Sequence, residues 1–224
     1  MSSIDKDKEM SKMTIFARMV DTTELLMGVR SGDQRALAKA ISLVENEELG
    51  YETLLASLKV SKTPVVGITG PPGAGKSTLI NALISHLTST GKKVGVIAVD
   101  PTSPFNFGSL LGDRLRMSEH FTDDKVFIRS LATRGSLGGL SAKAIEIVDV
   151  MREAGFDQII LETVGVGQSE VEVAGLADTT VLVLVPEAGD EIQTIKSGIM
   201  EIADIFVVNK ADREGADLFV NSLQ

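Results

Sequence analysis

Residues 65–78 read VVGITGPPGAGKST, and this stretch decides the fold class. An apolar, β-branched run comes first, and the pattern Gly70-x4-Gly75-Lys76-Ser77 follows it and opens a helix-like segment. A strand that leads through this pattern into a helix is the context that a phosphate-binding loop requires. Its glycines let backbone N–H groups turn toward a phosphate, and the amino end of the helix adds partial positive charge. The flanking strand and helix disfavour the alternative of a chance glycine-rich turn.

Two side chains of this loop have predicted chemical roles. Lys76 is expected to bridge the β- and γ-phosphates of a nucleotide, and the Ser77 hydroxyl is expected to bind Mg²⁺. The loop therefore predicts a nucleoside triphosphate hydrolase with a magnesium ion.

A second motif lies near the end of the sequence, where the apolar run IFVV leads directly into Asn209-Lys210-Ala211-Asp212. Ligands of such folds bind at the carboxyl ends of the strands, so these residues are expected at the nucleotide site. The Asp212 carboxylate can accept hydrogen bonds from N1 and N2 of guanine, whereas adenine offers no such pair of donors. A site that loses a required hydrogen-bond partner discriminates by ~10⁴-fold. Four loop residues with only a turn function are the less favoured alternative.

Three carboxylates between the two motifs are candidate magnesium ligands. Asp100 and Glu162 each end an apolar run, and Asp113 lies in the stretch GSLLGDRLRM. Mg²⁺ prefers carboxylate oxygens and keeps several of its waters. Asp113 has a plausible alternative role as a helix cap or as an ion-pair partner of Arg116. Gly165 follows Glu162 at the spacing of a backbone N–H that would sense a γ-phosphate.

The chain after Pro64 alternates between apolar runs and helix-like stretches. Near-continuous apolar strands alternating with helices predict an α/β fold, here a phosphate-loop NTPase with a mostly parallel sheet flanked by helices. The apolar runs lie at residues 65–68, 94–99, 126–128, 159–161, 181–185 and 205–208, and the helical stretches at 76–88, 140–154 and 191–202.

The N-terminal part has a different pattern. Residues 1–21 are predicted to be a flexible leader, residues 22–60 a helical extension with Asp33 as a helix cap, and residues 61–224 the GTPase domain. Residues 186–191 could form either a mobile switch loop or the capped start of a helix.

Composition excludes several classes of protein. The net charge of −9 argues against a nucleic-acid binder, whose footprint would be a basic stripe, and gives no reason to expect a membrane surface as partner. The chain has no cysteine and two histidines, which disfavours a soft-metal site. The polar start lacks the apolar core of a signal peptide, and no run approaches the ~20 residues of a membrane span. A cytoplasmic enzyme is the default expectation.

Seven motifs, in order along the chain, carry a family resemblance. GPPGAGKST, VDPTSP, LGDRLRM, TRGSLGGL, ETVGVGQSE, AGDEIQTIKSGI and VNKAD resemble the MeaB/ArgK-type G proteins, the family of the methylmalonic aciduria type A protein. The resemblance runs from about Glu24 onward. It implies a GTPase of the SIMIBI class that acts as a chaperone for an adenosylcobalamin-dependent acyl-CoA mutase, usually methylmalonyl-CoA mutase. In this family GTP gates cofactor loading and protection of the mutase.

The resemblance also implies site residues. Magnesium and switch roles would fall on Ser77, Asp100, Asp113 and Glu162, and catalytic roles on Lys76, Asp113 and Glu162. GTP or GDP contacts would fall on Gly70, Pro71, Pro72, Gly73, Ala74, Gly75, Lys76, Ser77, Thr78, Gly165, Asn209, Lys210 and Asp212.

Two features depart from the family pattern. Residues 105–109 read FNFGS where relatives carry a Thr-Gly-Gly-rich stretch. Relatives also continue beyond the guanine motif with a further base-contacting loop and a helical arm that forms a homodimer. Three rival functions stay open at this point: a metal-insertion GTPase, a nucleotide-binding scaffold without turnover, and the transport-associated ATPase of older family labels.

Overall fold

The computed structural model describes residues 20–59, 61–100, 117–132, 142–163, 175–186 and 199–223. For Asp100, Ala132, Ala142 and Ile199 only the backbone is described. The residues outside these ranges include 1–19 of the predicted leader, Asp113, Gly165, 187–191 of the candidate switch and most of the predicted helix at 191–202.

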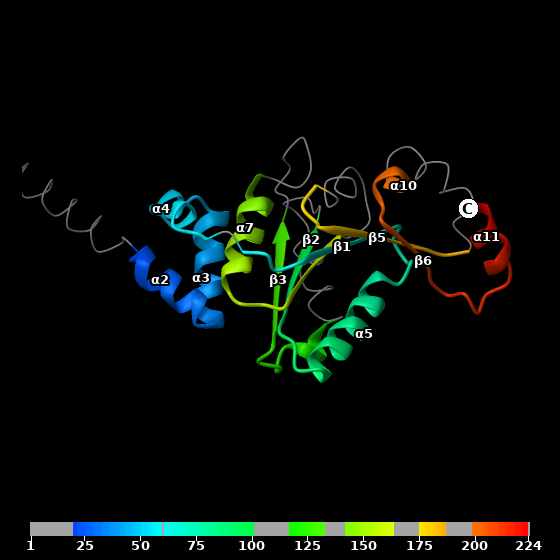
Figure 1. Cartoon of the computed structure of the whole chain (residues 1–224), viewed down its shortest axis with the longest axis horizontal. Helices are drawn as coiled ribbons and strands as arrows, with labels where there is room; N and C mark the ends of the chain where they lie inside the picture. Colours follow the sequence, from blue (N-terminus) through cyan, green and yellow to red (C-terminus); the bar gives the residue numbers. More distant parts are fainter. Residues whose placement is uncertain are drawn as a thin grey trace, which may run out of the picture.

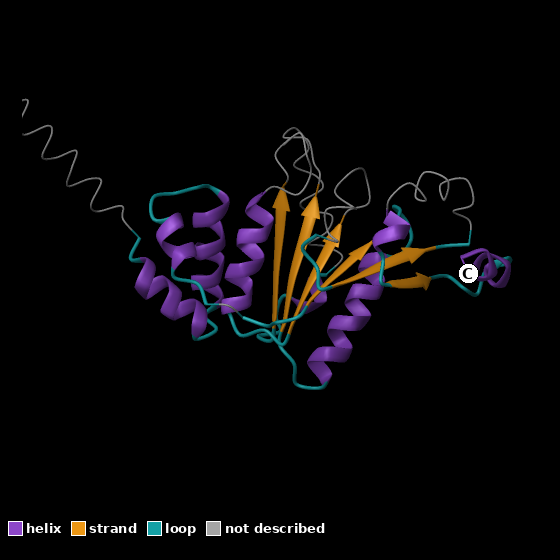
Figure 2. Ribbon diagram, turned by 45° about the horizontal axis from the view of Figure 1, so that its top comes forward, coloured by secondary structure: helices purple, strands orange, loops and turns teal. Residues whose placement is uncertain are grey.

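The described strands form one parallel sheet of six, in the order β3-β2-β4-β1-β5-β6. Their arrowheads in Figure 2 all point toward the same edge of the sheet. This confirms the predicted α/β class. The strands are β1 (Val65–Thr69), β2 (Val94–Asp100), β3 (Val126–Ala132), β4 (Gln158–Thr163), β5 (Thr179–Leu184) and β6 (Ile205–Val208).

Helices cover both faces of the sheet, which explains why its strands are apolar at nearly every position. On β4, Ile159 and Leu161 pack toward α7 (Ala142–Glu153), whereas Ile160 between them packs toward α5 (Lys76–Ser89). Figure 1 shows α5 and α7 on opposite sides of the strands. The sheet is therefore the middle layer of three, with a separate apolar core on each face.

Three N-terminal helices extend the layer formed by α7, as Figure 1 shows. They are α2 (Thr22–Arg30), α3 (Gln34–Glu45) and α4 (Tyr51–Ala56). The Asp33 carboxylate accepts from the backbone N–H groups of Arg35 and Ala36, which confirms its predicted role as the cap of α3. Buried residues of these helices belong to the same apolar cluster as α7 and one face of the sheet.

Polar contacts fasten the extension to both ends of α7. At its carboxyl end, the Glu153 side chain is 4% exposed and lies 2.6 Å from the Arg30 guanidinium. At its amino end, the Lys143 ammonium lies 3.2 Å from Glu47 and over the ring of Tyr51. Burial works to lower the pKa of Lys143, but the carboxylates of Glu146 and Glu47 outweigh it and raise this pKa above its ordinary value.

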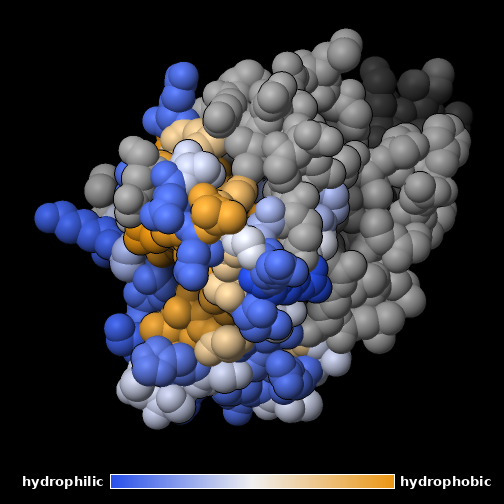
Figure 3. All heavy atoms as spheres, turned by 90° about the vertical axis from the view of Figure 1, so that its right-hand side faces the viewer, coloured by the Kyte–Doolittle hydropathy of each residue, from blue (hydrophilic) through white to orange (hydrophobic). Residues whose placement is uncertain are grey.

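The opposite end of the molecule exposes apolar surface. Strand β6 is the edge of the sheet, and α11 (Ala216–Leu223) follows it. Figure 3 views the molecule from this end and shows hydrophobic surface among hydrophilic residues. The exposed large apolar residues of β6 and α11 are Ile205, Phe206, Leu218 and Val220.

The remaining described elements are short. They are the 3-10 helix η1 (Ser118–His120) and α10 (Ile199–Ile202). Within the described part of the chain, no helix has the length and apolar character that a membrane crossing needs.

Candidate functional site

The glycine-rich loop between β1 and α5 has the conformation that its sequence predicts. Gly70, Gly73 and Gly75 all have positive φ, at 138°, 76° and 92°, and α5 begins at Lys76. A Cβ atom on Gly70 would overlap the carbonyl oxygen of Val183 on β5, and one on Gly75 would overlap the side-chain amide of Asn209. Both positions therefore require glycine for backbone conformation and for space.

The Lys76 side chain curls back into this loop. Lys76 is only 7% exposed. Its Nζ atom donates to the carbonyl oxygens of Gly70 at 2.6 Å and Pro71 at 3.0 Å. The ammonium is thus held against the loop between β1 and α5, beside the amino end of a helix, where phosphate oxygens are favoured. This arrangement fits the predicted role of Lys76.

The two predicted magnesium ligands Ser77 and Glu162 come together. The Ser77 hydroxyl donates to Oε1 of Glu162 at 2.7 Å, and Glu162 is 3% exposed. Glu162 lies opposite Ile68 in the sheet register, so β4 carries the carboxylate to the start of the phosphate loop. A hydroxyl beside a buried carboxylate is a donor set suited to a hard cation.

The other predicted magnesium residues are placed only in part. Asp100 ends β2, and the backbone of Ala98, two residues before it, lies opposite Glu162. Asp113 and Gly165 lie outside the described residues. Within the described part of the chain, no group of three or more potential metal-binding side chains is found.

Two buried threonines next to this pair were missed by the sequence reasoning. Thr69 ends β1 and Thr163 ends β4, and the Thr163 hydroxyl donates to the Thr69 hydroxyl at 3.1 Å. Both residues are fully buried. A threonine that directly follows an apolar strand was the available signal, because a polar residue at that point of a parallel sheet faces the ligand edge.

The guanine motif contacts the phosphate loop directly. Asn209 continues the β6 ladder through a bond from its N–H to the Leu184 carbonyl, and its side-chain amide donates to the carbonyl oxygen of Ala74 at 2.7 Å. Lys210 adopts a positive φ of 55°, and its ammonium donates to the carbonyl oxygen of Gly73 at 2.8 Å. Asp212 is exposed beyond them. The sequence predicted base contacts for all three residues, but it did not predict that two of them would hold the phosphate loop.

Comparisons with known proteins agree with this geometry. The family model described as methylmalonyl Co-A mutase-associated GTPase MeaB matches residues 37–224. A putative GTPase of Pyrococcus horikoshii is 57% identical over 197 residues, which cover 87% of this chain and 62% of the relative. The mitochondrial methylmalonic aciduria type A homolog of Mus musculus is 43% identical over 211 residues, covering 87% of this chain and 50% of that protein.

A solved structure gives the same result. The crystal structure of an LAO/AO transport system kinase superposes with a TM-score of 0.70 at 33% identity, covering 91% of this chain and 62% of that one. The chain thus spans between half and two thirds of the length of these relatives. The ordered motifs, the parallel sheet and the family match together confirm the resemblance: the chain belongs to the family of methylmalonyl Co-A mutase-associated GTPases, MeaB.

Proposed function

We propose that this chain binds GTP and GDP and hydrolyses GTP to GDP and phosphate. The observation that carries the proposal is the pair of contacts from Asn209 and Lys210 to the carbonyl oxygens of Ala74 and Gly73. These contacts place a guanine motif and a phosphate loop at one edge of the sheet, where each can hold one end of the same nucleotide. Asp212 then supplies the carboxylate that reads N1 and N2 of guanine.

The residues of the loop divide the chemical work between them. Lys76 would turn its ammonium from the loop carbonyls to the β- and γ-phosphates and stabilise charge on the transferring phosphoryl group. Ser77 and Glu162 would hold Mg²⁺, with Asp100 and Asp113 as further ligands directly or through water. Contacts to the remaining nucleotide atoms would come from the backbone of residues 70–78.

Hydrolysis by the isolated chain is expected to be slow. Among the described residues, no side chain beside Lys76 is a strong general base that could orient the attacking water. Phosphate-loop GTPases without a transition-state cation turn over slowly until a partner supplies or positions one. The proposed chemistry therefore calls for an activating partner.

We infer that this partner is an adenosylcobalamin-dependent acyl-CoA mutase of the methylmalonyl-CoA type. Support comes from the family description, which names association with that mutase. The chain would act as its chaperone, with GTP gating cofactor loading or protection. Such gating requires that the mutase favour one nucleotide-bound arrangement over the other. A family-type homodimer and a cytoplasmic location stay predictions.

A phosphate-release assay tests both parts. GTP and ATP are each supplied with Mg²⁺, with and without a methylmalonyl-CoA mutase, and the longer relative from Pyrococcus horikoshii serves as a matched control. Slow release from GTP, none from ATP, and a rise on adding mutase are expected. Equal release from ATP would reject the guanine assignment. No change with mutase in both proteins would reject the partner but leave the GTPase assignment standing.

A further inference from the structure

Three aspartates make the same pair of hydrogen bonds at the amino edge of the sheet. Each stands immediately before a strand: Asp157 before β4, Asp178 before β5 and Asp204 before β6. Each donates its backbone N–H to the carbonyl oxygen of one residue on the neighbouring strand, or immediately before it in the case of Asp157, and accepts that residue's N–H on its Oδ2 atom. We call this two-bond arrangement a carboxylate clasp.

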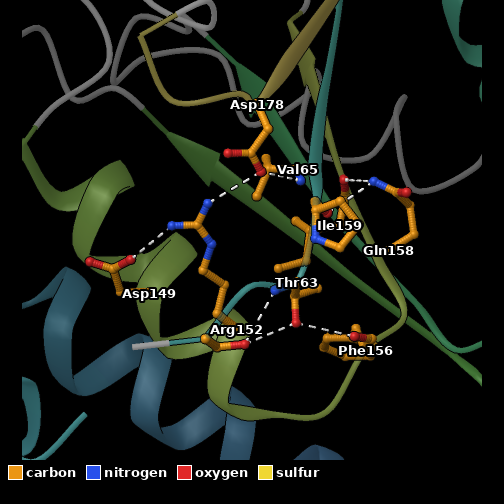
Figure 4. A network of polar contacts seen from close by, with 10 residues as sticks. Thr63, Val65, Asp149, Arg152, Phe156, Gln158, Ile159 and Asp178 are labelled. Carbon is orange, nitrogen blue, oxygen red and sulfur yellow. Dashed lines mark hydrogen bonds and ion pairs between the residues drawn. The ribbon is translucent and has the colours of Figure 1, made fainter. Parts of the chain in front are cut away.

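The three clasps have nearly identical dimensions. Asp178 and Val65 exchange bonds of 2.8 Å and 2.8 Å, joining β5 to β1. Asp204 and Thr180 exchange bonds of 2.7 Å and 2.9 Å, joining β6 to β5. Asp157 and Lys93 exchange bonds of 2.8 Å and 2.9 Å, joining β4 to β2. In Figure 4 the Asp178 carboxylate lies between the backbone of Val65 and the guanidinium of Arg152.

Register in this sheet needs such a device. Where only one face of a sheet is buried, a slip by one residue drives apolar side chains into water and is strongly disfavoured. Both faces are buried in the middle of this sheet, where β4 presents Ile159, Ile160 and Leu161 in succession, whereas β6 at the edge exposes Ile205 and Phe206. A slip would exchange one apolar side chain for another. The clasp is specific for register because only one residue of the neighbouring strand lies opposite each aspartate.

Two of the clasps lie at the start of the strands that lead to the two halves of the proposed nucleotide site. From Val65, β1 runs to Gly70, which lies so close to the carbonyl of Val183 on β5 that no Cβ fits between them. From Asp204, β6 runs to Asn209, whose N–H bonds to the carbonyl of Leu184, also on β5. Both loops therefore contact the same strand, β5.

We propose that Asp178 and Asp204 are positioning residues for nucleotide recognition: Asp178 fixes the phosphate loop, and Asp204 fixes the guanine motif, each against β5. This inference rests on the proposed function. Asp157 joins β4 to β2, neither of which carries the phosphate loop or the guanine motif, so it provides an internal control with the same chemistry. Neither positioning residue touches the nucleotide itself.

The test compares two affinity ratios measured by calorimetry without Mg²⁺. The ratio of GDP to GMP affinity reports the hold on the β-phosphate, and the ratio of GDP to ADP affinity reports base choice. Asp178→Ala should lower the first ratio by about tenfold, a scale typical of one lost hydrogen bond that leaves a buried donor unpaired. Asp204→Ala should lower the second ratio by about tenfold for the same reason.

Three controls accompany these variants. Asp157→Ala removes the same pair of bonds at a more exposed position, so it should cost less thermal stability and leave both ratios unchanged. Arg152→Gln removes the 3.4 Å contact to Asp178 without removing the clasp, and should also leave both ratios unchanged. Asp178→Asn and Asp204→Asn each keep an acceptor oxygen and should restore most of the lost ratio.

Amide hydrogen exchange provides an arm that needs no nucleotide. Asp178→Ala should speed exchange in residues 65–75 more than in residues 205–212, and Asp204→Ala should do the reverse. The two Asn variants, which keep an acceptor oxygen, should exchange at rates close to those of the wild type. The inference is overturned if either variant changes both segments or both ratios equally, or if Asp157→Ala matches Asp178→Ala. A wild-type chain that binds ADP as well as GDP would instead reject the proposed function, and the exchange measurement would still decide the inference.

Discussion

The side-chain amide of Asn209 donates a hydrogen bond to the carbonyl oxygen of Ala74, although 135 residues separate them along the chain. Because the amide also occupies the space that a side chain at position 75 would need, the two motifs fit together only with glycine there. The two motifs of the proposed nucleotide site are therefore in direct contact.

Asp212→Asn should change base choice. The amide offers one donor and one acceptor where the carboxylate accepts twice, so guanine loses a partner and xanthine gains one. Wild-type chain should melt at a higher temperature with GDP than with ADP, because a ligand that binds only the folded state stabilises it. The variant should prefer xanthosine diphosphate. Stabilisation of the wild type by ADP to the same extent as by GDP would contradict the assignment.

Lys76→Ala should abolish GTP hydrolysis. The change removes the charge expected to stabilise the transferring phosphoryl group, while alanine keeps α5 intact. Phosphate release measures the effect, and circular dichroism confirms the fold. Lys125→Ala is the matched control, since Lys125 also donates its ammonium to a backbone carbonyl, that of Thr88 at 3.3 Å, but far from the loop in the sequence. A folded Lys76→Ala chain with wild-type turnover would refute the role of this lysine.

Ser77→Ala should uncouple magnesium from nucleotide binding. The wild-type chain should bind GDP more tightly when Mg²⁺ is added, because Ser77 would help to hold an ion that offsets the charge of the phosphates. In the variant, titrations of GDP with and without Mg²⁺ should give the same affinity. Ser89→Ala removes a hydroxyl from the same helix, where it donates to the carbonyl of His86, and should keep the magnesium effect. If both variants lost the effect of Mg²⁺ on GDP affinity, Ser77 would not be a specific magnesium ligand.

Gly70→Ala should destabilise the fold far more than Gly91→Ala. Both glycines have positive φ, which costs an alanine about 1–2 kcal/mol. Only Gly70 adds an overlap with backbone, at the carbonyl of Val183, whereas the space around Gly91 is open. Urea unfolding of the two variants isolates this packing term. Equal losses of stability would show that the loop can move away from β5.

Glu153→Ala should loosen the N-terminal helices. The change leaves the Arg30 guanidinium and the backbone N–H of Lys59 without their buried acceptor, which should cost about 1–3 kcal/mol of unfolding free energy. Asp149→Ala is the control on the same helix, because the Asp149 side chain is 47% exposed and its pair with Arg152 should contribute less than about 1 kcal/mol. Urea unfolding compares the two. A cost no larger than that of the control would deny Glu153 a role in docking the helices.

Local patterns in the sequence predicted most of the elements. The β6 run at 205–208 matches its strand, and the helix predicted at 76–88 is α5 with one further residue. Strand β3 was predicted too short, at 126–128, because Arg129 and Ser130 interrupt the apolar run. The Arg129 guanidinium lies 2.6 Å from Glu45 at the end of α3. The partner of this charge is thus on a distant helix, which a local sequence pattern cannot predict. Helix α11 was missed altogether.

In the candidate site, too, the sequence predicted residues that belong to short motifs but not the contacts between residues far apart in the chain. Lys76, Ser77 and Asn209 could be found because each belongs to a short motif. The contacts of Lys210 with Gly73 and of Ser77 with Glu162 could not, because 137 and 85 residues separate the partners. Strand order and register decide which loops meet, and near-continuous apolar strands fix neither in advance.

The fastening of the N-terminal helices to α7 has a consequence for synthesis on the ribosome. Arg30 leaves the ribosome 123 residues ahead of Glu153, its ion-pair partner. At a synthesis rate of about 5–20 residues per second this delay lasts about ten seconds, which is long compared with the folding of a single helix. During that interval Leu26, Val29 and Ile41, all buried in the finished protein, do not yet have the complete α7 to pack against. Docking of the N-terminal helices is therefore a late event in synthesis, and slower translation would delay it further.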